Sequence, residues 1–251
     1  ELNLKSGAGS PTVQLRTNEN AGGIINVFNQ RSNAVSALTT TSAGNGRLML
    51  SSVDNVLVLD LKTNIGGGGF LSLFNDESTE AVRLSTAENR GGIISVRNRA
   101  GNTAVNLSTN NVGDGGLFVR SGANTAVGDL SVNTNGGGFF SISNQDPVEI
   151  FRITTTAQRQ GSMRMNNRLG NLTAELTSNQ FSDGEFRLHS VLTNPTVLLT
   201  ANNNAGGLIN IFNQQGLIAA QATELDGNGD LRINNELGEE KVRINTMNGS
   251  G

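Results

Sequence analysis

The sequence predicts an all-β repeat protein: a β-helix or β-solenoid of ten 23-residue units, with chains intertwined or side by side in a parallel homotrimer. Three observations lead to this prediction. A glycine returns every 23 residues, large apolar residues follow it at a spacing of two, and Asn or Ser marks a turn in each unit. The array covers about 11–246 of a single repeat domain, 1–251, and its tenth unit is one residue short.

The glycine that opens each unit keeps its place through the array. We interpret it as a position of tight backbone geometry, because glycine is tolerated where the chain turns or approaches another backbone closely. The column consists of Gly23, Gly46, Gly69, Gly92, Gly115, Gly138, Gly161, Gly184 and Gly207.

Apolar residues two apart, with mostly polar residues such as Asn26 and Ser95 between them, predict strands with one inward face and one face in water. A helix would need spacings of three and four. Each unit is expected to contribute two short strands, about 23–28 and 34–39 in the first. The predicted structural core is Leu15, Ile25, Val27, Leu38, Leu48, Leu50, Leu61, Leu71, Leu73, Leu84, Ile94, Val96, Leu107, Leu117, Val119, Leu130, Phe140, Ile142, Ile153, Met163, Met165, Leu176, Phe186, Leu188, Leu199, Ile209 and Ile211.

A column of Asn or Ser between the two strands predicts the turn. Gly follows three residues later in several units, for example Gly101 and Gly170, which is typical of a type I turn. The pairing of Val27 with Ser36 and of Ile25 with Leu38 would fit a hairpin, and a solenoid corner fits equally well. The Asn amides could also bond the units above and below. The column includes Asn29, Asn75, Asn98, Asn144, Asn167 and Asn213.

The number of chains follows from how little apolar surface each unit supplies. The linking stretches 17–22 and 86–91 carry no inward apolar column, so in a one-chain coil they would form a wall without a lining. In three chains side by side, each chain supplies a third of the interior, and the stretch becomes an outer crossing between layers. This argument favours a homotrimer.

Composition excludes several partners. The net charge is -3 without a basic cluster, so neither nucleic acid nor an anionic membrane surface is expected. The chain has no Cys, which excludes disulfides and thiolate metal sites. No segment reaches the length of a membrane-spanning helix, and the N-terminal residues lack the features of a signal peptide.

Candidate catalytic and ligand sites are few. His189 is the only histidine and is expected to be a surface residue. The stretch 226–230, DGNGD, is similar to the start of a calcium loop, but Leu231 and Leu237 stand where that loop needs Gly and Glu. The glycine runs 66–69 and 136–138 lack the Lys-Ser/Thr and helix of a phosphate loop. We predict no catalytic, cofactor-binding or metal-binding residue, and no cofactor.

Three further patterns allow alternative interpretations. The acidic pairs Asp76–Glu77 and Glu239–Glu240 are interpreted as solvated corners rather than glycosidase acids. A threonine column is expected to face outward through β-propensity rather than for ice binding. It comprises Thr17, Thr40, Thr63, Thr86, Thr109 and Thr155. Outward phenylalanines are expected to fill space between chains, or else to contact other fibres or a host surface; they are Phe28, Phe74 and Phe212, with Phe70 and Phe139 nearby.

The unit G-x-φ-x-φ-x-N-x-x-G-x-x-φ-x-L, where φ is apolar, resembles the repeats of trimeric β-helical fibre shafts in phage tail fibres and bacterial surface fibres. The resemblance implies an extracellular, cell-surface or virion-associated rod. The expected function is a non-enzymatic fibre or filament shaft that assembles with itself. End-to-end assembly into a filament and a contact with carbohydrate or a cell surface stay open. The alternatives are a monomeric β-solenoid that binds carbohydrate or an ice-like surface, and a tailspike-type polysaccharide depolymerase.

Overall fold

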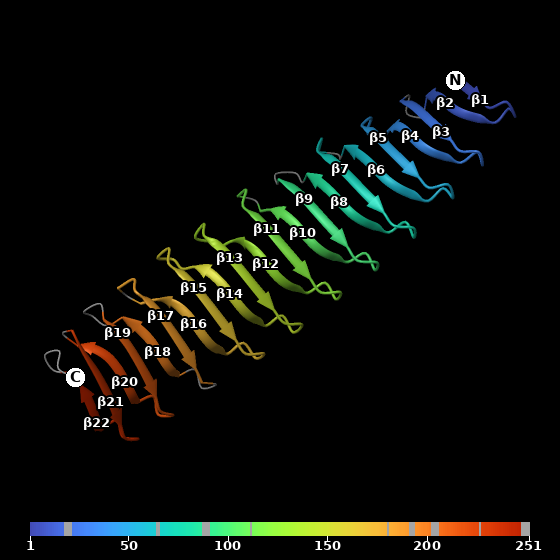
Figure 1. Ribbon diagram of the computed structural model, residues 1–251. Coiled ribbons are helices and arrows are strands. Elements are labelled where there is room, and N and C mark those ends of the chain that lie inside the picture. The colour runs from blue at the N-terminus through green and yellow to red at the C-terminus, as the bar shows by residue number, and fades with distance from the viewer. Residues whose placement is uncertain are drawn as a thin grey trace. The chain divides into compact units, whose positions relative to one another are not determined.

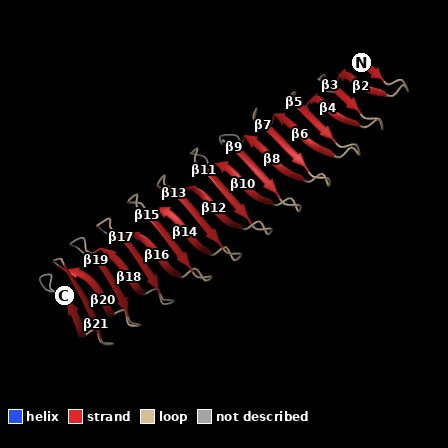
Figure 2. Ribbon diagram, viewed as in Figure 1, coloured by secondary structure: helices blue, strands red, loops and turns tan. Residues whose placement is uncertain are grey.

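A computed structural model describes residues 1–17, 22–63, 66–86, 91–110, 112–179, 181–190, 194–201, 206–225 and 227–246. In these ranges the chain forms 22 strands and no helix (Figures 1 and 2), which confirms the prediction of repetitive all-β structure. Residues 18–21 and 87–90, which make up most of the linking stretches 17–22 and 86–91, lie outside the described part. Asp226 of the calcium-like stretch 226–230 also lies outside it.

The chain divides into two compact units, Glu1–Ala126 and Val127–Gly251, each of which contains several of the 23-residue repeats. The first unit contains β1 (Leu2–Lys5), β2 (Pro11–Thr17), β3 (Gly23–Phe28), β4 (Ala34–Thr40), β5 (Gly46–Ser51), β6 (Leu57–Thr63), β7 (Gly69–Phe74), β8 (Glu80–Thr86), β9 (Gly92–Arg97), β10 (Thr103–Thr109) and β11 (Gly115–Arg120). In Figure 1 these strands lie side by side in chain order, from blue to green.

The second unit repeats the same arrangement. It contains β12 (Ala126–Val132, which starts on the last residue of the first unit), β13 (Gly138–Ser143), β14 (Glu149–Thr155), β15 (Gly161–Asn166), β16 (Leu172–Ser178), β17 (Gly184–His189), β18 (Pro195–Ala201), β19 (Gly207–Phe212), β20 (Ile218–Leu225), β21 (Asn228–Asn234) and β22 (Glu240–Asn245).

Within each unit every strand pairs with the next one along the chain, and the pairs are antiparallel. In the first unit Ile25 lies opposite Leu38 and Val27 opposite Ser36, which is the hairpin alternative of the sequence prediction. The joint at the glycine column is also a hairpin, since Thr40 pairs with Gly46 and Leu38 with Leu48. Each unit of the chain is therefore an open meander, and the single chain does not show the coil of a β-helix.

The two ends of the strands carry the same kind of turn. At one end Asn29 N donates to Asn33 O and Ser32 N to Asn29 O; at the other, Thr41 N donates to Asn45 O and Gly44 N to Thr41 O. The fourth residue has positive φ in both, 63° at Ser32 and 80° at Gly44. A type I turn followed by a left-handed residue is a common three- to five-residue hairpin connection.

A β-bulge recurs at the Asn end of the strands. The register shifts between Val27 and Phe28, because Phe28 pairs with Ala34 and leaves Val35 as an extra residue. The same shift recurs between Leu50 and Ser51 and between Leu73 and Phe74. A bulge increases the local right-handed twist of the strand that carries it.

The shortened tenth unit changes a hairpin loop and leaves the strands paired. Leu225 lies opposite Asn228, so only two residues connect β20 and β21. Ala222 still faces Leu231, and Leu231 faces Ile244. The apolar column therefore continues, because the missing residue was removed from a connection and not from a strand.

Candidate interaction surface

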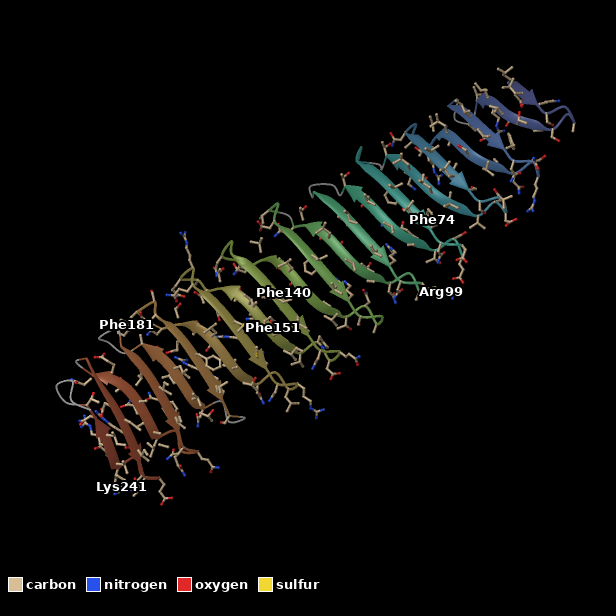
Figure 3. All side chains as sticks on the ribbon, viewed as in Figure 1. Phe74, Arg99, Phe140, Phe151, Phe181 and Lys241 are labelled. Atoms are coloured by element: carbon tan, nitrogen blue, oxygen red, sulfur yellow. The ribbon has the colours of Figure 1, made fainter. Side chains whose placement is uncertain are left out.

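The predicted core columns lie together on one face of the strands, which we call the apolar face. Alternation along each strand and the cross-strand register both require this arrangement, for example Leu61 opposite Leu71 and Leu71 opposite Leu84. No apolar residue in the described ranges is buried. Figure 3 shows the side chains standing on the ribbon without a second layer over them.

Most of the large apolar side chains on this face are exposed to solvent. Six predicted core residues are half-buried, namely Leu48, Leu71, Leu117, Phe140, Met163 and Phe186. The other 21 are exposed, from 37% at Leu73 and Leu188 to 54% at Leu130. Phe140 meets Phe151 edge to face, with ring centroids 6.0 Å apart. Soluble monomers rarely expose a continuous apolar surface of this kind, so the face is the main candidate site of the molecule.

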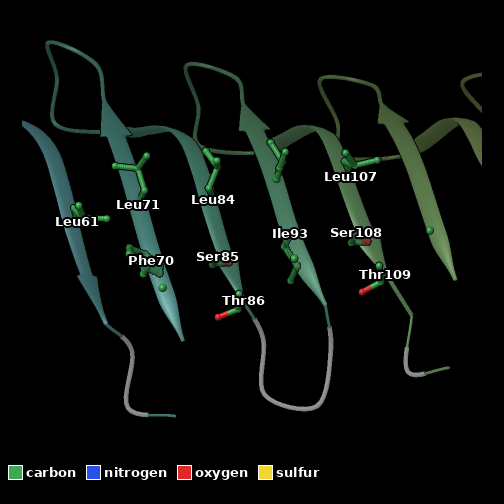
Figure 4. Close-up of a pocket in the computed structure, with 14 residues that line it drawn as sticks. Leu61, Phe70, Leu71, Leu84, Ser85, Thr86, Ile93, Leu107, Ser108 and Thr109 are labelled. Carbon is green, nitrogen blue, oxygen red and sulfur yellow. The ribbon is translucent and has the colours of Figure 1, made fainter. Parts of the chain in front are cut away.

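A groove runs along the apolar face of the first unit beside the glycine column. Its volume is about 580 Å³. Figure 4 shows the row Leu71, Leu84 and Leu107 on one side, with Thr86 and Thr109 nearer the strand ends. The groove exists because the strand ends carry Gly or Thr where the next column carries Leu or Ile. Its lining is almost entirely apolar.

The glycines of this groove differ from a neighbouring glycine whose role is clear. Gly91 N donates to Thr109 Oγ1 at 2.8 Å, and a Cβ on Gly91 would lie 2.4 Å from that oxygen. A Cβ on Gly92 would meet nothing within 4 Å, and the φ of Gly92 is not in the left-handed region. Gly69 has the same open surroundings. Contacts within one chain therefore explain Gly91 but do not explain the groove glycines.

The second unit carries a groove at the equivalent place. It has a volume of about 480 Å³ and is lined by Leu199, Thr200, Gly207, Leu208, Ile209, Ala222, Thr223 and Glu224. Both halves of the chain therefore carry a groove between the glycine column and the neighbouring Leu/Ile column.

The opposite face, which we call the mixed face, holds the buried groups of the described chain. Sequence analysis placed Asn26 and Ser95 on a face in water, but both are buried, as are Asp60 and Ser72. These residues occupy the middle of their strands, with a neighbouring strand on each side. Asp60, for example, lies opposite Met49 and Ser72.

Asp60 is held by two cations across the strands. Its oxygens lie 2.6 Å from Arg47 Nε and 2.8 Å from Lys62 Nζ, and its side chain is only 3% exposed. Burial by itself raises the pKa of the Asp60 carboxyl, but the hydrogen bonds from Arg47 and Lys62 outweigh it and the pKa is lowered. Asp60 is therefore charged at neutral pH. The sequence pattern did not predict this cluster, although the basic residues Arg47 and Lys62 at flanking cross-strand positions are its signal.

A second ionic cluster lies two strands along. Glu80 accepts a hydrogen bond from Ser72 Oγ at 2.6 Å and pairs with Arg83 and Arg97 at 2.9 and 3.0 Å. Burial raises the pKa of Glu80, and the bonds from Arg83 and Ser72 lower it by more. The ring of Phe70 lies between Lys62 and Arg83, at 4.8 and 5.0 Å. The cations thus stack on an aromatic ring and neutralise the carboxylates.

The turn column links successive repeats. Asn29 Nδ2 donates to Val53 O at 3.2 Å, Asn144 Nδ2 to Arg168 O at 3.2 Å and Asn213 Nδ2 to Glu236 O at 3.0 Å. Each acceptor belongs to the turn of the following repeat. These Asn side chains therefore bond the following repeat, as the sequence allowed, but through its backbone carbonyl and not as a ladder of stacked Asn amides.

The residues considered for catalysis or metal binding do not come together in one site. His189 ends β17, and Asp230 pairs with Arg232 and Arg243 at 2.6 and 2.8 Å, on the mixed face. In the described part of the chain no group of three His, Cys, Asp or Glu side chains could hold a metal ion. The same residues contain no helix of the length and apolar character needed to cross a membrane.

Of the predicted corner residues, Asp76 and Glu77 lie in a turn, whereas Glu239 directly precedes β22 and Glu240 begins it. Glu77 pairs with Arg99 of the next turn, and Glu239 with Lys241 at 3.0 Å. Gly67 and Gly136 supply the positive φ of their hairpins, 82° and 78°, rather than a phosphate cradle before a helix. Four of the phenylalanines expected to face outward, Phe28, Phe70, Phe74 and Phe139, lie on the mixed face, where Arg152 stacks on Phe139 at 5.6 Å.

The threonine column requires a correction. It does not face outward: Thr40 lies opposite Gly46 and Thr63 opposite Gly69, on the apolar face beside the Leu column. The reason is the period of two, since a residue two positions after an inward Leu must share its face. These threonines form one side of the grooves.

Comparison with known proteins gives no family. No protein-family model matches the chain. A comparison with curated proteins finds no match either. Among solved structures the chain is similar to the TCP10 domain of Danio rerio CPAP (6% identity, TM-score 0.28, covering 92% of this chain and 99% of that one). It is also similar to the Photorhabdus luminescens Tc holotoxin pore (6% identity, TM-score 0.20, covering 97% of this chain and 17% of that one). A porin-like protein from Bacteroides uniformis is similar at 12% identity and a TM-score of 0.17, covering 93% of this chain and 92% of that one. At these scores the likenesses support no inference about function.

Proposed function

We propose that the protein is a structural, non-catalytic shaft, in which three identical chains lie side by side and bury their apolar faces against one another. The observation that carries this proposal is the absence of any buried apolar residue in the described chain, combined with one exposed face of Leu, Ile, Val, Met and Phe. Burial of apolar surface is the main force that stabilises folded proteins. The face must therefore be covered for the fold to be stable.

Surface area supports a large self-contact. The chain exposes 15555 Å². A compact monomer of 26.3 kDa exposes roughly 10,600 Å² by the usual scaling of area with mass. The excess is about 5,000 Å² per chain, several times the ~800 Å² per partner of a standard interface. An obligate assembly accounts for an excess of this size.

Strand length supports three chains. The strands of six or seven residues span about 20–23 Å at roughly 3.3 Å per residue. A triangular tube with walls of that width has its axis about 6 Å from each wall, close to half of the ~10 Å that separates packed sheets. Apolar side chains from three walls therefore meet at the axis. A square tube would leave each wall about 10 Å from the axis, too far for contact.

The mixed face suits the outside of such a shaft. Its carboxylates at Asp60, Glu80 and Asp230, of which Asp60 and Asp230 are buried, already have cationic partners within the chain. The turns at both strand ends are satisfied by their own backbone and Asn hydrogen bonds. The face that lacks partners is the apolar one, and it is the face that the shaft would enclose.

The test is the mass of the purified protein by size-exclusion chromatography with multi-angle light scattering. The expected mass is three times the 26.3 kDa of one chain. A mass of one chain would overturn the proposal and favour a monomeric binding module, and a mass of two chains would overturn the trimer.

A substitution pair tests which face is used. Leu84→Asp places a charge on the apolar face, where Leu84 is 40% exposed in the single chain. We expect it to reduce the assembled fraction strongly, because a buried unpaired carboxylate is costly. Ser85→Asp is the control: Ser85 borders the groove, but strand alternation directs its side chain to the mixed face, so the variant should keep the three-chain mass. Equal effects of the two variants would contradict the proposed interface.

A further inference from the structure

The groove beside the glycine column gives the proposed assembly a direction. This step rests on the proposed self-association and deepens it. Along the apolar face the columns run from the Gly and Thr strand ends, through the Leu and Ile row, to a third column next to the Asn turns. The third column contains Leu73, Val96 and Val119, with exposures of 37%, 40% and 41%. The side chains of the apolar face are thus small or absent at the glycine edge, which we call the low edge, and large at the edge next to the Asn turns, which we call the high edge.

The groove is open to a partner and empty within the chain. It holds about 580 Å³, enough for several aliphatic side chains, and its apolar row includes Leu71, Leu84 and Leu107. A Cβ on Gly69, Gly92 or Gly115 would meet nothing within 4 Å, so no other part of the described chain uses this space. Glycine also weakens a strand relative to β-branched residues, and a single chain gains nothing from it here.

We propose that the groove of one chain receives the third-column side chains of a second copy, Leu73, Val96 and Val119 of the neighbour packing over the backbone of Gly69, Gly92 and Gly115. The low edge of one sheet then meets the high edge of the next. Such a head-to-tail contact uses two different surface patches, and it closes as a ring when the rotation between copies is one third of a turn.

The alternative packing of two copies does not use the groove in the same way. A two-fold pair is isologous and closes with two chains, whereas the edge-to-edge contact leaves a free groove and a free third column until a third chain joins. The groove therefore decides which edge of the neighbour each edge meets, whereas the strand length sets the number of chains at three.

Disulfide cross-linking tests this arrangement, because the protein has no cysteine of its own. Gly92→Cys is combined in separate variants with Leu73→Cys, Val96→Cys or Val119→Cys, which covers offsets of about one strand pair either way. Within one chain the sites of each pair are farther apart than the ~7 Å between Cα atoms that a disulfide tolerates, judged from strand rise and spacing. Any product is therefore between chains.

After oxidation, at least one double variant should give a covalent three-chain band on a non-reducing denaturing gel. The single variants Gly92→Cys, Leu73→Cys, Val96→Cys and Val119→Cys should stay at one chain. A two-chain band as the largest product, or cross-linking of Gly92→Cys alone, would overturn the head-to-tail contact even if light scattering shows self-association. A one-chain mass before oxidation would instead overturn the proposed function.

A second variant gives an independent readout. Gly92→Val fills the groove and raises the strand propensity of β9, so it should not harm a single chain. We expect it to raise the concentration at which the assembly dissociates at least tenfold. Ile93→Val is the control: Ile93 borders the groove, but strand alternation directs its side chain to the mixed face, so the variant should leave this concentration within about twofold. An unchanged assembly in Gly92→Val would overturn the proposal.

Discussion

At the scale of single residues, the cross-strand neighbours of a charge decide its contribution. Asp60 and Asp54 are both aspartates with a basic partner. Asp60 is 3% exposed and bridges Arg47 and Lys62, whereas Asp54 is 70% exposed and contacts Arg31 at 2.8 Å. Hydrogen bonds between charged groups away from solvent contribute about 1.5–3 kcal/mol each, and exposed ion pairs usually contribute less than about 1 kcal/mol.

Asp60→Asn is therefore expected to lower the free energy of unfolding by about 1–3 kcal/mol, because it leaves two cations without their carboxylate. Asp54→Asn is the matched control and should change it by less than about 0.5 kcal/mol. Urea unfolding at pH 7, at one protein concentration, measures both. Equal losses would show that the burial of Asp60 has no energetic role.

The pH dependence follows from the same contact. The pKa of Asp60 is lowered in the folded protein, so its contribution to stability is present above the unfolded Asp pKa of about 3.9. It is lost as the pH falls through the folded pKa. The difference in urea midpoint between wild type and Asp60→Asn should be full at pH 6–7 and shrink below about pH 4. A difference that grows on acidification would contradict this assignment.

At the scale of elements, the turns are set by one residue with positive φ. Gly101 has φ of 81°, while Gly122, in the next turn of the same column, does not lie in the left-handed region. A Cβ on Gly101 would be 3.7 Å from Thr79 Cγ2, an ordinary contact, so the constraint on Gly101 is conformational and not steric crowding. Other turns place Ser32 or Asn55 there, at a conformational cost.

Gly101→Ala should thus lower stability by about 1–2 kcal/mol, since the left-handed region is costly for residues with a Cβ. Gly122→Ala, with open space around it, should be neutral or slightly stabilising because it restricts the unfolded chain. Thermal unfolding followed by circular dichroism would measure the two. The result that would refute this account is a larger loss in Gly122→Ala.

At the scale of the whole molecule, stability is expected to depend on protein concentration. The described chain buries no apolar side chain, so folding and association should be coupled. Over a hundredfold range of concentration the unfolding temperature should rise by a few degrees, because mass action favours the associated state. A temperature that does not change over that range would mean that the single chain is stable by itself. Ser85→Asp is the control and should follow the wild-type curve.

Much of the architecture could be predicted from single columns of residues. The interval of 23 predicts the repeat, the spacing of two predicts strands, and the Asn column with Gly101 and Gly170 predicts turns, which the strands and hydrogen bonds bear out. The ion pairs of Asp60 and the groove could not be foreseen in the same way. Both depend on which residues become cross-strand neighbours, and register is decided by turn length and bulges.

The sequence by itself determined that the chain is repetitive and that its strands have one apolar face. Only the tertiary structure decided that both joints are hairpins, that the face is an open sheet surface, and that the threonine column lies on it beside a groove. The physical reason is that periodicity specifies local conformation and facing, whereas the direction in which the chain turns depends on the turn geometry and register between consecutive strands.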